Sequence, residues 1–168
     1  ANDNIWIATM GNGVFKYNQK TQQIEHYTNQ INDKHSISSN SVSSITETSN
    51  GDIWFATDRG GICKYDSKEN NFRTVSLAEG LPDDTAYKIV EDKNGYLWFG
   101  TNSGLVQFDP QNFTIETYST DNGLPSNQFN YKSALASSTG ELFFGTLEGL
   151  ISFFPERLEQ NSFIPPVY

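Results

Sequence analysis

Short apolar segments alternate with polar turns along the chain. Between residues 41 and 76, an alternating segment (41–48) precedes a nearly continuous apolar run (52–57), and two short segments follow (62–66 and 71–76). The stretches SNGD, DRGG and SKEN separate these segments and are rich in residues that favour turns. The pattern predicts four short antiparallel β-strands, because the apolar positions follow the two-residue period of a strand and not the spacing of a helix.

The apolar run belongs to a pattern that recurs four times. In each copy an aromatic residue is followed by a threonine, then by a glycine, and four residues after the glycine by a second aromatic residue. The first aromatic residues are spaced 48, 44 and 45 residues apart. The aligned positions are Trp6, Trp54, Trp98 and Phe143; Thr9, Thr57, Thr101 and Thr146; Gly13, Gly61, Gly104 and Gly149; and Tyr17, Tyr65, Phe108 and Phe153. Four strands in each copy, at a period of about 45 residues, are typical of the blades of a β-propeller.

The predicted fold class is therefore all-β, a partial propeller of about three and a half four-stranded antiparallel blades over residues 1–154. Residues 155–168 are expected to form an exit linker. The first copy lacks an innermost strand and the last ends after its third strand, so we expect a fragment of a larger protein. Its open sheet edges are expected to pair with another copy, with a missing part of the same parent, or in an aggregate, and we expect pairing between copies in a crystal. Within each blade the tryptophan strand is expected to be apolar on both faces and hidden from water, and the aligned glycine to adopt a positive φ.

Composition narrows the classes of function. The net charge of −9 argues against a binder of nucleic acid or of anionic membranes, since both need a basic surface. The single cysteine, Cys63, aligns with apolar strand positions and is predicted to be a buried hydrophobic residue. The two histidines, His26 and His35, stand apart from any patterned carboxylate and predict no metal site, and we expect no cofactor. Asn-Gly and Asp-Asn-Gly stretches, and the triplet beginning at Asn112, are interpreted as turns.

Residues 50–66 and 94–109 resemble the two-component regulator propeller repeat, and so does the link over residues 79–92. The resemblance extends over essentially the whole chain, with Phe143 departing from the usual tryptophan. It implies the periplasmic sensor region of a hybrid two-component protein that is anchored in the inner membrane and carries its histidine kinase elsewhere. Such proteins commonly sense glycan fragments and control polysaccharide-utilisation genes, and they can pair as homodimers. The linker would lead to a following Tyr-rich, immunoglobulin-like domain.

Polar residues of the links and turns are the candidate ligand contacts. They fall on one predicted face of the propeller, where amides, carboxylates, one arginine and tyrosines would suit an oligosaccharide. The same residue types also cap turns in loops that bind nothing. The candidates are Asn40, Asp58, Arg59, Asp84, Tyr87, Asn102, Asn127, Tyr131 and Glu148.

Three functions stay open from the sequence. A ligand-sensing module follows from the family resemblance. A propeller-fold glycan hydrolase or lyase is the second. A hydrolase would need two carboxylates at a defined separation, and Asp58, Asp84 and Glu148 are the acids expected at the entrance. A protein-interaction scaffold would bind no small ligand at all.

Overall fold

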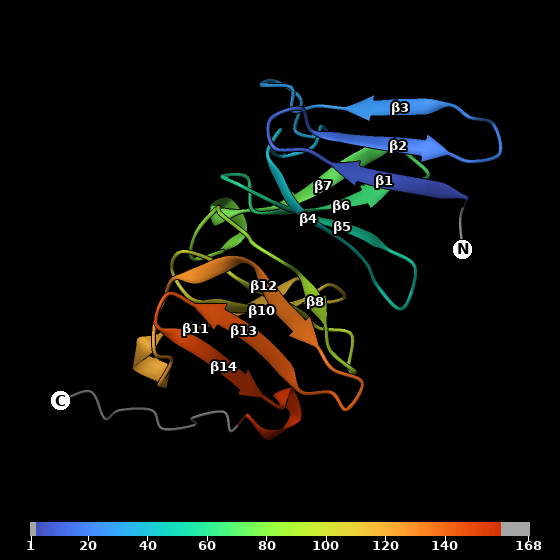
Figure 1. Cartoon of the computed structure of the whole chain (residues 1–168). Helices are drawn as coiled ribbons and strands as arrows, with labels where there is room; N and C mark the ends of the chain where they lie inside the picture. The colour runs from blue at the N-terminus through green and yellow to red at the C-terminus, as the bar shows by residue number, and fades with distance from the viewer. Residues whose placement is uncertain (1–2, 159–168) are drawn as a thin grey trace.

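A computed structural model describes residues 3–158, which form four antiparallel β-sheets in chain order (Figure 1). The first and last sheets have three strands and the two middle sheets have four. The first sheet contains β1 (Asn4–Ala8), β2 (Val14–Asn18) and β3 (Ile24–Tyr27), and the second contains β4 (Val42–Glu47), β5 (Ile53–Thr57), β6 (Ile62–Asp66) and β7 (Asn71–Val75). The third contains β8 (Val90–Glu91), β9 (Leu97–Gly100), β10 (Leu105–Asp109) and β11 (Thr114–Tyr118), and the fourth contains β12 (Phe129–Ala136), β13 (Leu142–Thr146) and β14 (Gly149–Phe153).

These sheets are the predicted blades. The first starts at its tryptophan strand and the fourth ends at its third strand, so the all-β, partial-propeller prediction is confirmed. Two short 3₁₀ helices, η1 (Leu77–Glu79) and η2 (Thr120–Asn122), lie in the links between sheets, and a third, η3 (Pro155–Arg157), follows β14. Residues 159–168 of the predicted exit linker lie outside the described residues. Among residues 3–158, no helix has the length and apolar character needed to cross a membrane.

The recurring threonine and glycine close the same turn in every sheet. The hydroxyls of Thr9, Thr57, Thr101 and Thr146 donate to the carbonyl oxygens of Gly13, Gly61, Gly104 and Gly149, at 2.8, 2.9, 2.8 and 3.0 Å. All four glycines have a positive φ, as predicted. At Gly61 a Cβ atom would also collide with the carbonyl oxygen of Val75, so this position excludes any side chain.

Neighbouring sheets are hydrogen-bonded through the carbonyl oxygen of the same threonines. The backbone N–H groups of Val42, Ala86 and Phe129 donate to the carbonyls of Thr9, Thr57 and Thr101, at 2.9, 2.9 and 3.2 Å. Each donor stands where the chain enters the next sheet, so every sheet is tied to the one before it.

The core lies between sheets, in three clusters at the three interfaces. At each interface the tryptophan of one sheet packs against the aromatic residue on the third strand of the next sheet. The centroids are 4.8 Å apart for Trp6 and Tyr65, 5.5 Å for Trp54 and Phe108, and 5.1 Å for Trp98 and Phe153. The aromatic residues therefore fill the space between blades.

The expectation that the tryptophan strand avoids water on both faces holds for the middle sheets but not for the first. β5 and β9 are buried almost throughout, because they have a sheet on either side. β1 alternates instead, with Ile5 and Ile7 exposed on the face that points away from the second sheet. Cys63 is fully buried at the first interface, and burial raises the pKa of its thiol to about 11.

Candidate functional site

The residue after each aligned threonine leaves the tryptophan strand at one end of the sheet. Two of these residues, Asp58 and Asn102, meet the link that connects the second and third sheets. The hydroxyl of Tyr87 donates to Oδ1 of Asn102 at 2.6 Å, and Nδ2 of Asn102 donates to Asp83 at 3.3 Å. The hydroxyl of Thr85 donates to Asp58 at 3.4 Å. Carboxylates, an amide and a phenol from two sheets and one link are thus joined in a single network.

A bulge in β12 brings the fourth sheet into this network. Residues 130–133 stand opposite the single Gly145 of β13, and Lys132 adopts a left-handed conformation with φ of 57°. The bulge places the ring of Tyr131 with its centroid 5.8 Å from that of Tyr87, in an edge-on arrangement. The hydroxyl of Tyr131 donates to the sulfur of Met10 at 2.7 Å, although 121 residues separate the two. Tyr131 therefore connects the first and fourth sheets.

We call these residues the turn-face cluster: Met10, Asp58, Asp83, Tyr87, Asn102 and Tyr131. Burial raises the pKa of Tyr87, and the negative charges of Asp83 and Asp58 raise it further. Burial and the charge of Asp58 act in the same direction on the pKa of Tyr131. Both phenols are therefore neutral at ordinary pH and can donate hydrogen bonds. Tyr131 is 41% exposed, which leaves part of its ring open to a ligand.

Arg59 supplies the positive charge beside the cluster. Its side chain is exposed and its guanidinium lies 3.6 Å from the carboxylate of Asp58. The residue adopts a left-handed conformation with φ of 60°, which is uncommon for a residue with a side chain. Carboxylate, amide, phenol and guanidinium groups together can donate to and accept from a polar ligand.

Three other candidates have a backbone role. The side-chain oxygens of Asn40, Asp84 and Asn127 accept from the N–H groups of Asn29, Leu77 and Thr120, each at 2.7 Å. Their carbonyl oxygens accept from the glycine-containing turn of the preceding sheet. These residues fix the links at equivalent places.

The last candidate, Glu148, is exposed in the turn between β13 and β14. Within the part of the chain that the structure describes, no hydrogen bond or ion pair joins its carboxylate to the turn-face cluster. The alignment explains why: Leu147, and not Glu148, follows the aligned threonine directly. The same comparison places Met10 in line with Asp58 and Asn102, so the repeat alignment contained a signal for Met10. Asp83 had no such signal.

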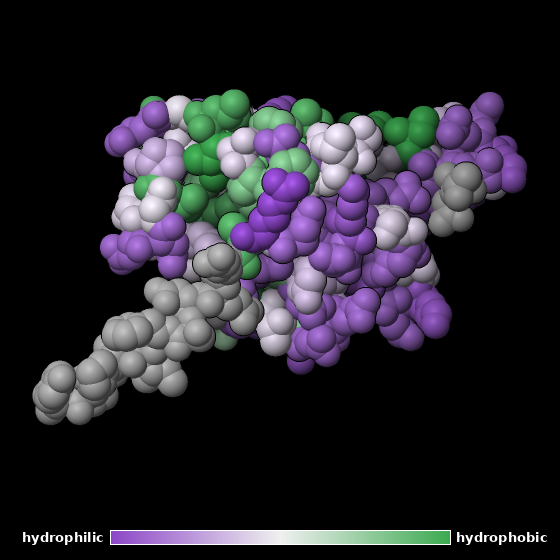
Figure 2. Space-filling model, turned by 90° about the horizontal axis from the view of Figure 1, so that it is seen from below, coloured by the Kyte–Doolittle hydropathy of each residue, from purple (hydrophilic) through white to green (hydrophobic). Residues whose placement is uncertain are grey.

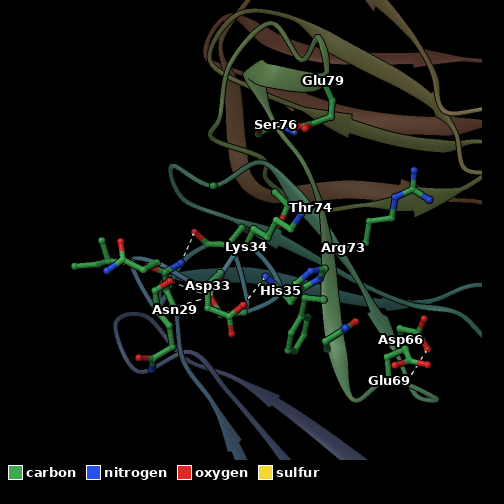
Figure 3. A pocket seen from close by; sticks show the side chains of 18 residues that line it. Asn29, Asp33, Lys34, His35, Asp66, Glu69, Arg73, Thr74, Ser76 and Glu79 are labelled. Atoms are coloured by element: carbon green, nitrogen blue, oxygen red, sulfur yellow. Dashed lines mark hydrogen bonds between the residues drawn. The ribbon is translucent and has the colours of Figure 1, made fainter.

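A hollow of about 880 Å³ lies elsewhere, between the link over residues 28–41 and the edge strand β7 (Figure 3). In this link Asn29 and its capping Asn40 are 11 positions apart, whereas the equivalent residues of the other two links are 7 positions apart. The carbonyl oxygen of His35 accepts from the N–H of Phe72 at 2.8 Å, which covers part of the strand edge. Asp33 and Glu69 line the hollow together with the apolar side chains of Ile31 and Phe72.

The histidines lie in ordinary polar surroundings. Nε2 of His26 is 2.7 Å from the carbonyl oxygen of Asn12, and its ring stacks on Phe15 with centroids 4.1 Å apart. Across residues 3–158, no three His, Cys, Asp or Glu side chains come together in a group that could hold a metal ion.

Two segments of these sheets match the model of a known protein family. Residues 36–59 and 80–103 match the model of the two component regulator propeller. These two segments are two-component regulator propeller repeats. Each matched span runs from a link through the inner strand and the tryptophan strand to the turn. The two spans contain six of the candidate residues that the structure places on links and turns: Asn40, Asp58, Arg59, Asp84, Tyr87 and Asn102.

Solved structures similar to this chain include two extracellular domains from B. thetaiotaomicron. The extracellular domain of the hybrid two component system BT3049 from B. thetaiotaomicron is 30% identical with a TM-score of 0.79, and the match covers 93% of this chain and 21% of that one. The extracellular domain of BT4673 from the same organism is 24% identical with a TM-score of 0.74, covering 96% and 24%. The chain thus spans less than a quarter of either relative, and the similarity supports a sensor module.

A more distant likeness shows the fold alone. Virginiamycin B lyase from Staphylococcus aureus is 20% identical with a TM-score of 0.58, and the match covers 90% of this chain and 56% of that one. No curated protein matches the sequence.

Proposed function

We propose that the chain is part of the extracytoplasmic, ligand-binding module of a hybrid two-component signalling protein, and that it binds a glycan fragment at the turn-face cluster. The observation that carries this proposal is that the cluster joins residues from all four sheets, with Met10 and Tyr131 in contact across 121 positions of the sequence. A ligand that contacts the cluster would change how the sheets are held together.

The chemistry of the cluster suits a sugar. Pyranose rings present apolar faces that stack on aromatic rings, and the partly exposed ring of Tyr131 offers such a face. Hydroxyl groups need both donors and acceptors, which Asn102 and Asp58 supply. Arg59 would pair with the carboxylate of a uronate.

In the intact protein this module would lie in the periplasm, with an anchor in the inner membrane and a histidine kinase in another segment. Ligand binding would alter the packing of a parent homodimer and, through the kinase, the expression of polysaccharide-utilisation genes. The module would act by binding and not by catalysis.

Calorimetry with a panel of neutral and uronate-containing oligosaccharides tests the proposal. For any ligand that binds, Tyr131→Ala and Asn102→Ala should each weaken the affinity at least about tenfold, which corresponds to about 1.4 kcal/mol. Asn71→Ala, in the hollow beside β7, is the matched control and should leave the affinity unchanged. Binding that is lost with Asn71→Ala but kept with Tyr131→Ala would move the site to the hollow. Turnover of any glycan in the panel would contradict the proposal and show that the module is an enzyme.

A further inference from the structure

The strand β7 is the outermost strand of a complete four-stranded sheet, and the first and third sheets pack on the two faces of this sheet. Both neighbours of the second sheet in the ring are therefore present, and the outer edge of β7 lies on the rim, where no further blade covers it. The hollow of about 880 Å³ lies against this edge. None of the residues of the turn-face cluster lines it, so the hollow is a separate place in the fold.

Two residues of β7, Phe72 and Thr74, direct their backbone groups away from β6 and toward the hollow. The N–H of Phe72 donates to the carbonyl oxygen of His35, which belongs to the link and not to β6. Because the backbone groups of successive residues in an antiparallel strand alternate in direction, those of Thr74 point the same way as those of Phe72. Within residues 3–158, the carbonyl oxygen of Phe72 and both backbone groups of Thr74 have no hydrogen-bond partner.

The open part of this edge is short, because both of its ends are occupied. At one end the carbonyl oxygen of His35 accepts from the N–H of Phe72 at 2.8 Å. At the other end the carboxylate of Glu79 accepts from the N–H of Ser76 at 2.7 Å. The free groups of Phe72 and Thr74 lie between these two bonds. They match the N–H and C=O groups of a short extended peptide, which would add a strand to the sheet at this place.

The charged side chains around the hollow favour a basic ligand. Those that line it are Asp33, Asp66, Glu69 and Glu79, against Lys34 and Arg73. The guanidinium carbon of Arg73 lies 3.6 Å from the ring centroid of Phe113, so this cation is held against the third sheet. The carboxylate of Glu69 is exposed and has no hydrogen bond or ion pair in the described part of the chain. Negative charge is therefore in excess beside the open edge.

The hollow also offers one apolar contact. Two of its lining residues are hydrophobic: Phe72, which is buried, and Ile31, which is 96% exposed. Other exposed hydrophobic residues, among them Leu135 and Leu150, lie in the fourth sheet, and Figure 2 shows hydrophobic residues gathered on the face of the molecule where that sheet lies. A ligand in the hollow would thus be recognised by backbone and charged groups, with a single apolar side chain against Ile31.

We propose that the hollow is a second ligand site, independent of the glycan site, and that it binds a short basic peptide in extended conformation along β7. A peptide residue opposite Thr74 would exchange N–H···O hydrogen bonds with it. Lysine or arginine side chains of the peptide would lie near Glu69 and Asp66. The ligand is a free peptide and not a strand of a folded partner, because only a few residues can pair between the bonds of His35 and Glu79. The module would then respond to two classes of compound.

Fluorescence anisotropy with the labelled pentapeptide acetyl-Lys-Val-Lys-Val-Lys-amide tests the proposal on this chain. The same peptide with glutamate in place of lysine should bind at least about tenfold more weakly. A version that is N-methylated along its backbone keeps the side chains and the charge but lacks the N–H donors, and it should also bind at least about tenfold more weakly. Thr74→Pro removes the N–H group from the edge without removing a bond to β6, and should weaken the binding of the basic peptide at least about tenfold as well.

Thr117→Pro is the matched control, because Thr117 occupies the place of Thr74 on the outer strand of the third sheet. Glu69→Lys should weaken binding at least about threefold, because it reverses one charge beside the hollow. Asp121→Lys makes the same change at an exposed residue of η2 and should leave binding unchanged.

If Thr74→Pro does not fold, the N-methylated peptide still tests the pairing on the wild-type chain. Equal affinity for the basic peptide and its N-methylated version would overturn the proposed pairing. Equal loss of binding in Thr74→Pro and Thr117→Pro would show that the site is not at β7. A wild-type chain that binds the basic peptide no better than the acidic one would overturn the proposal altogether.

Discussion

The carboxylate of Asp92 accepts a buried hydrogen bond from the indole nitrogen of Trp98, with Oδ2 and Nε1 2.9 Å apart. Oδ1 of the same carboxylate accepts from the N–H groups of Asn94 and Tyr96. In the preceding repeat Thr48 occupies the place of Asp92, and its hydroxyl donates to Asn50 instead. The indole nitrogen of Trp54 is consequently buried without a hydrogen-bond partner in the described structure.

We predict that replacing tryptophan by phenylalanine lowers the free energy of unfolding by different amounts at positions 98 and 54. Trp98→Phe removes the donor from a buried carboxylate, whereas Trp54→Phe removes a donor that has no acceptor. Both variants lose similar apolar volume, so the difference between them reports the hydrogen bond. Trp98→Phe should lower the free energy of unfolding by about 1.5–3 kcal/mol more than Trp54→Phe. Urea denaturation of both variants measures this, and equal costs would contradict the assigned hydrogen bond.

The unsatisfied indole also predicts a stabilising change. Thr48→Asp would place a carboxylate where the next repeat has Asp92, and should raise the free energy of unfolding by about 1 kcal/mol. The gain should vanish in a Trp54→Phe background, because the donor is then gone. A double-mutant cycle on the two positions measures the coupling. A gain that persists without the indole would assign the effect to something other than this hydrogen bond.

Substitutions of the link-capping residues should affect stability and not ligand binding. Asp84→Ala and Asn127→Ala each leave the N–H of Leu77 or Thr120 without its acceptor, and each should cost about 1 kcal/mol. Thermal unfolding measures the cost. If either variant also abolished the binding of an oligosaccharide at temperatures where it is folded, the residue would belong to the ligand site.

The buried thiol predicts a loss of stability at high pH. Folding raises the pKa of Cys63 from 9.0 to about 11, so the folded state favours the neutral thiol. The stability that the buried neutral thiol contributes is fully present below about pH 9 and is lost as the pH rises toward 11. The wild-type chain should therefore lose more stability between pH 8 and pH 11 than Cys63→Ala does. Denaturation curves at the two pH values measure the difference.

Reactivity gives an independent check on the same thiol. At pH 8 the folded chain should not react with a disulfide reagent, and one equivalent should react after unfolding in urea. Rapid labelling of the folded chain would show that Cys63 is accessible.

The strands were predictable because local pattern determines them. The segments expected at 52–57 and 62–66 agree with β5 and β6 to within one residue, since apolar runs and turn residues bound them closely. The inner strand of the third sheet is the exception, because β8 has only two residues. Here the hydroxyls of Ser43 and Thr46 donate to the carbonyls of Ala86 and Ile89, so part of this segment bonds to a neighbouring sheet's side chains.

The candidate site was predictable only in part. The alignment of repeats identified Asp58 and Asn102, whose position after the threonine recurs. The contact between Tyr131 and Met10 depends on a bulge and on residues 121 positions apart, and no local pattern encodes either. The hollow beside β7 depends on the extra length of one link.

The backbone hydrogen bonds between neighbouring sheets bear on how a propeller gains blades during evolution. The hydroxyl of one threonine donates a hydrogen bond within the turn of its own sheet, and the carbonyl oxygen of the same threonine accepts one from the backbone of the next sheet. The span from residue 36 to residue 59 contains Val42, whose N–H donates to the preceding sheet. It also contains Thr57, whose carbonyl oxygen accepts from the chain that enters the following sheet. A gene segment that encodes a whole repeat of about 45 residues contains this span and therefore carries both the donor to the preceding sheet and the acceptor for the following one. Tandem duplication of such a segment would add a blade that bonds to both of its neighbours.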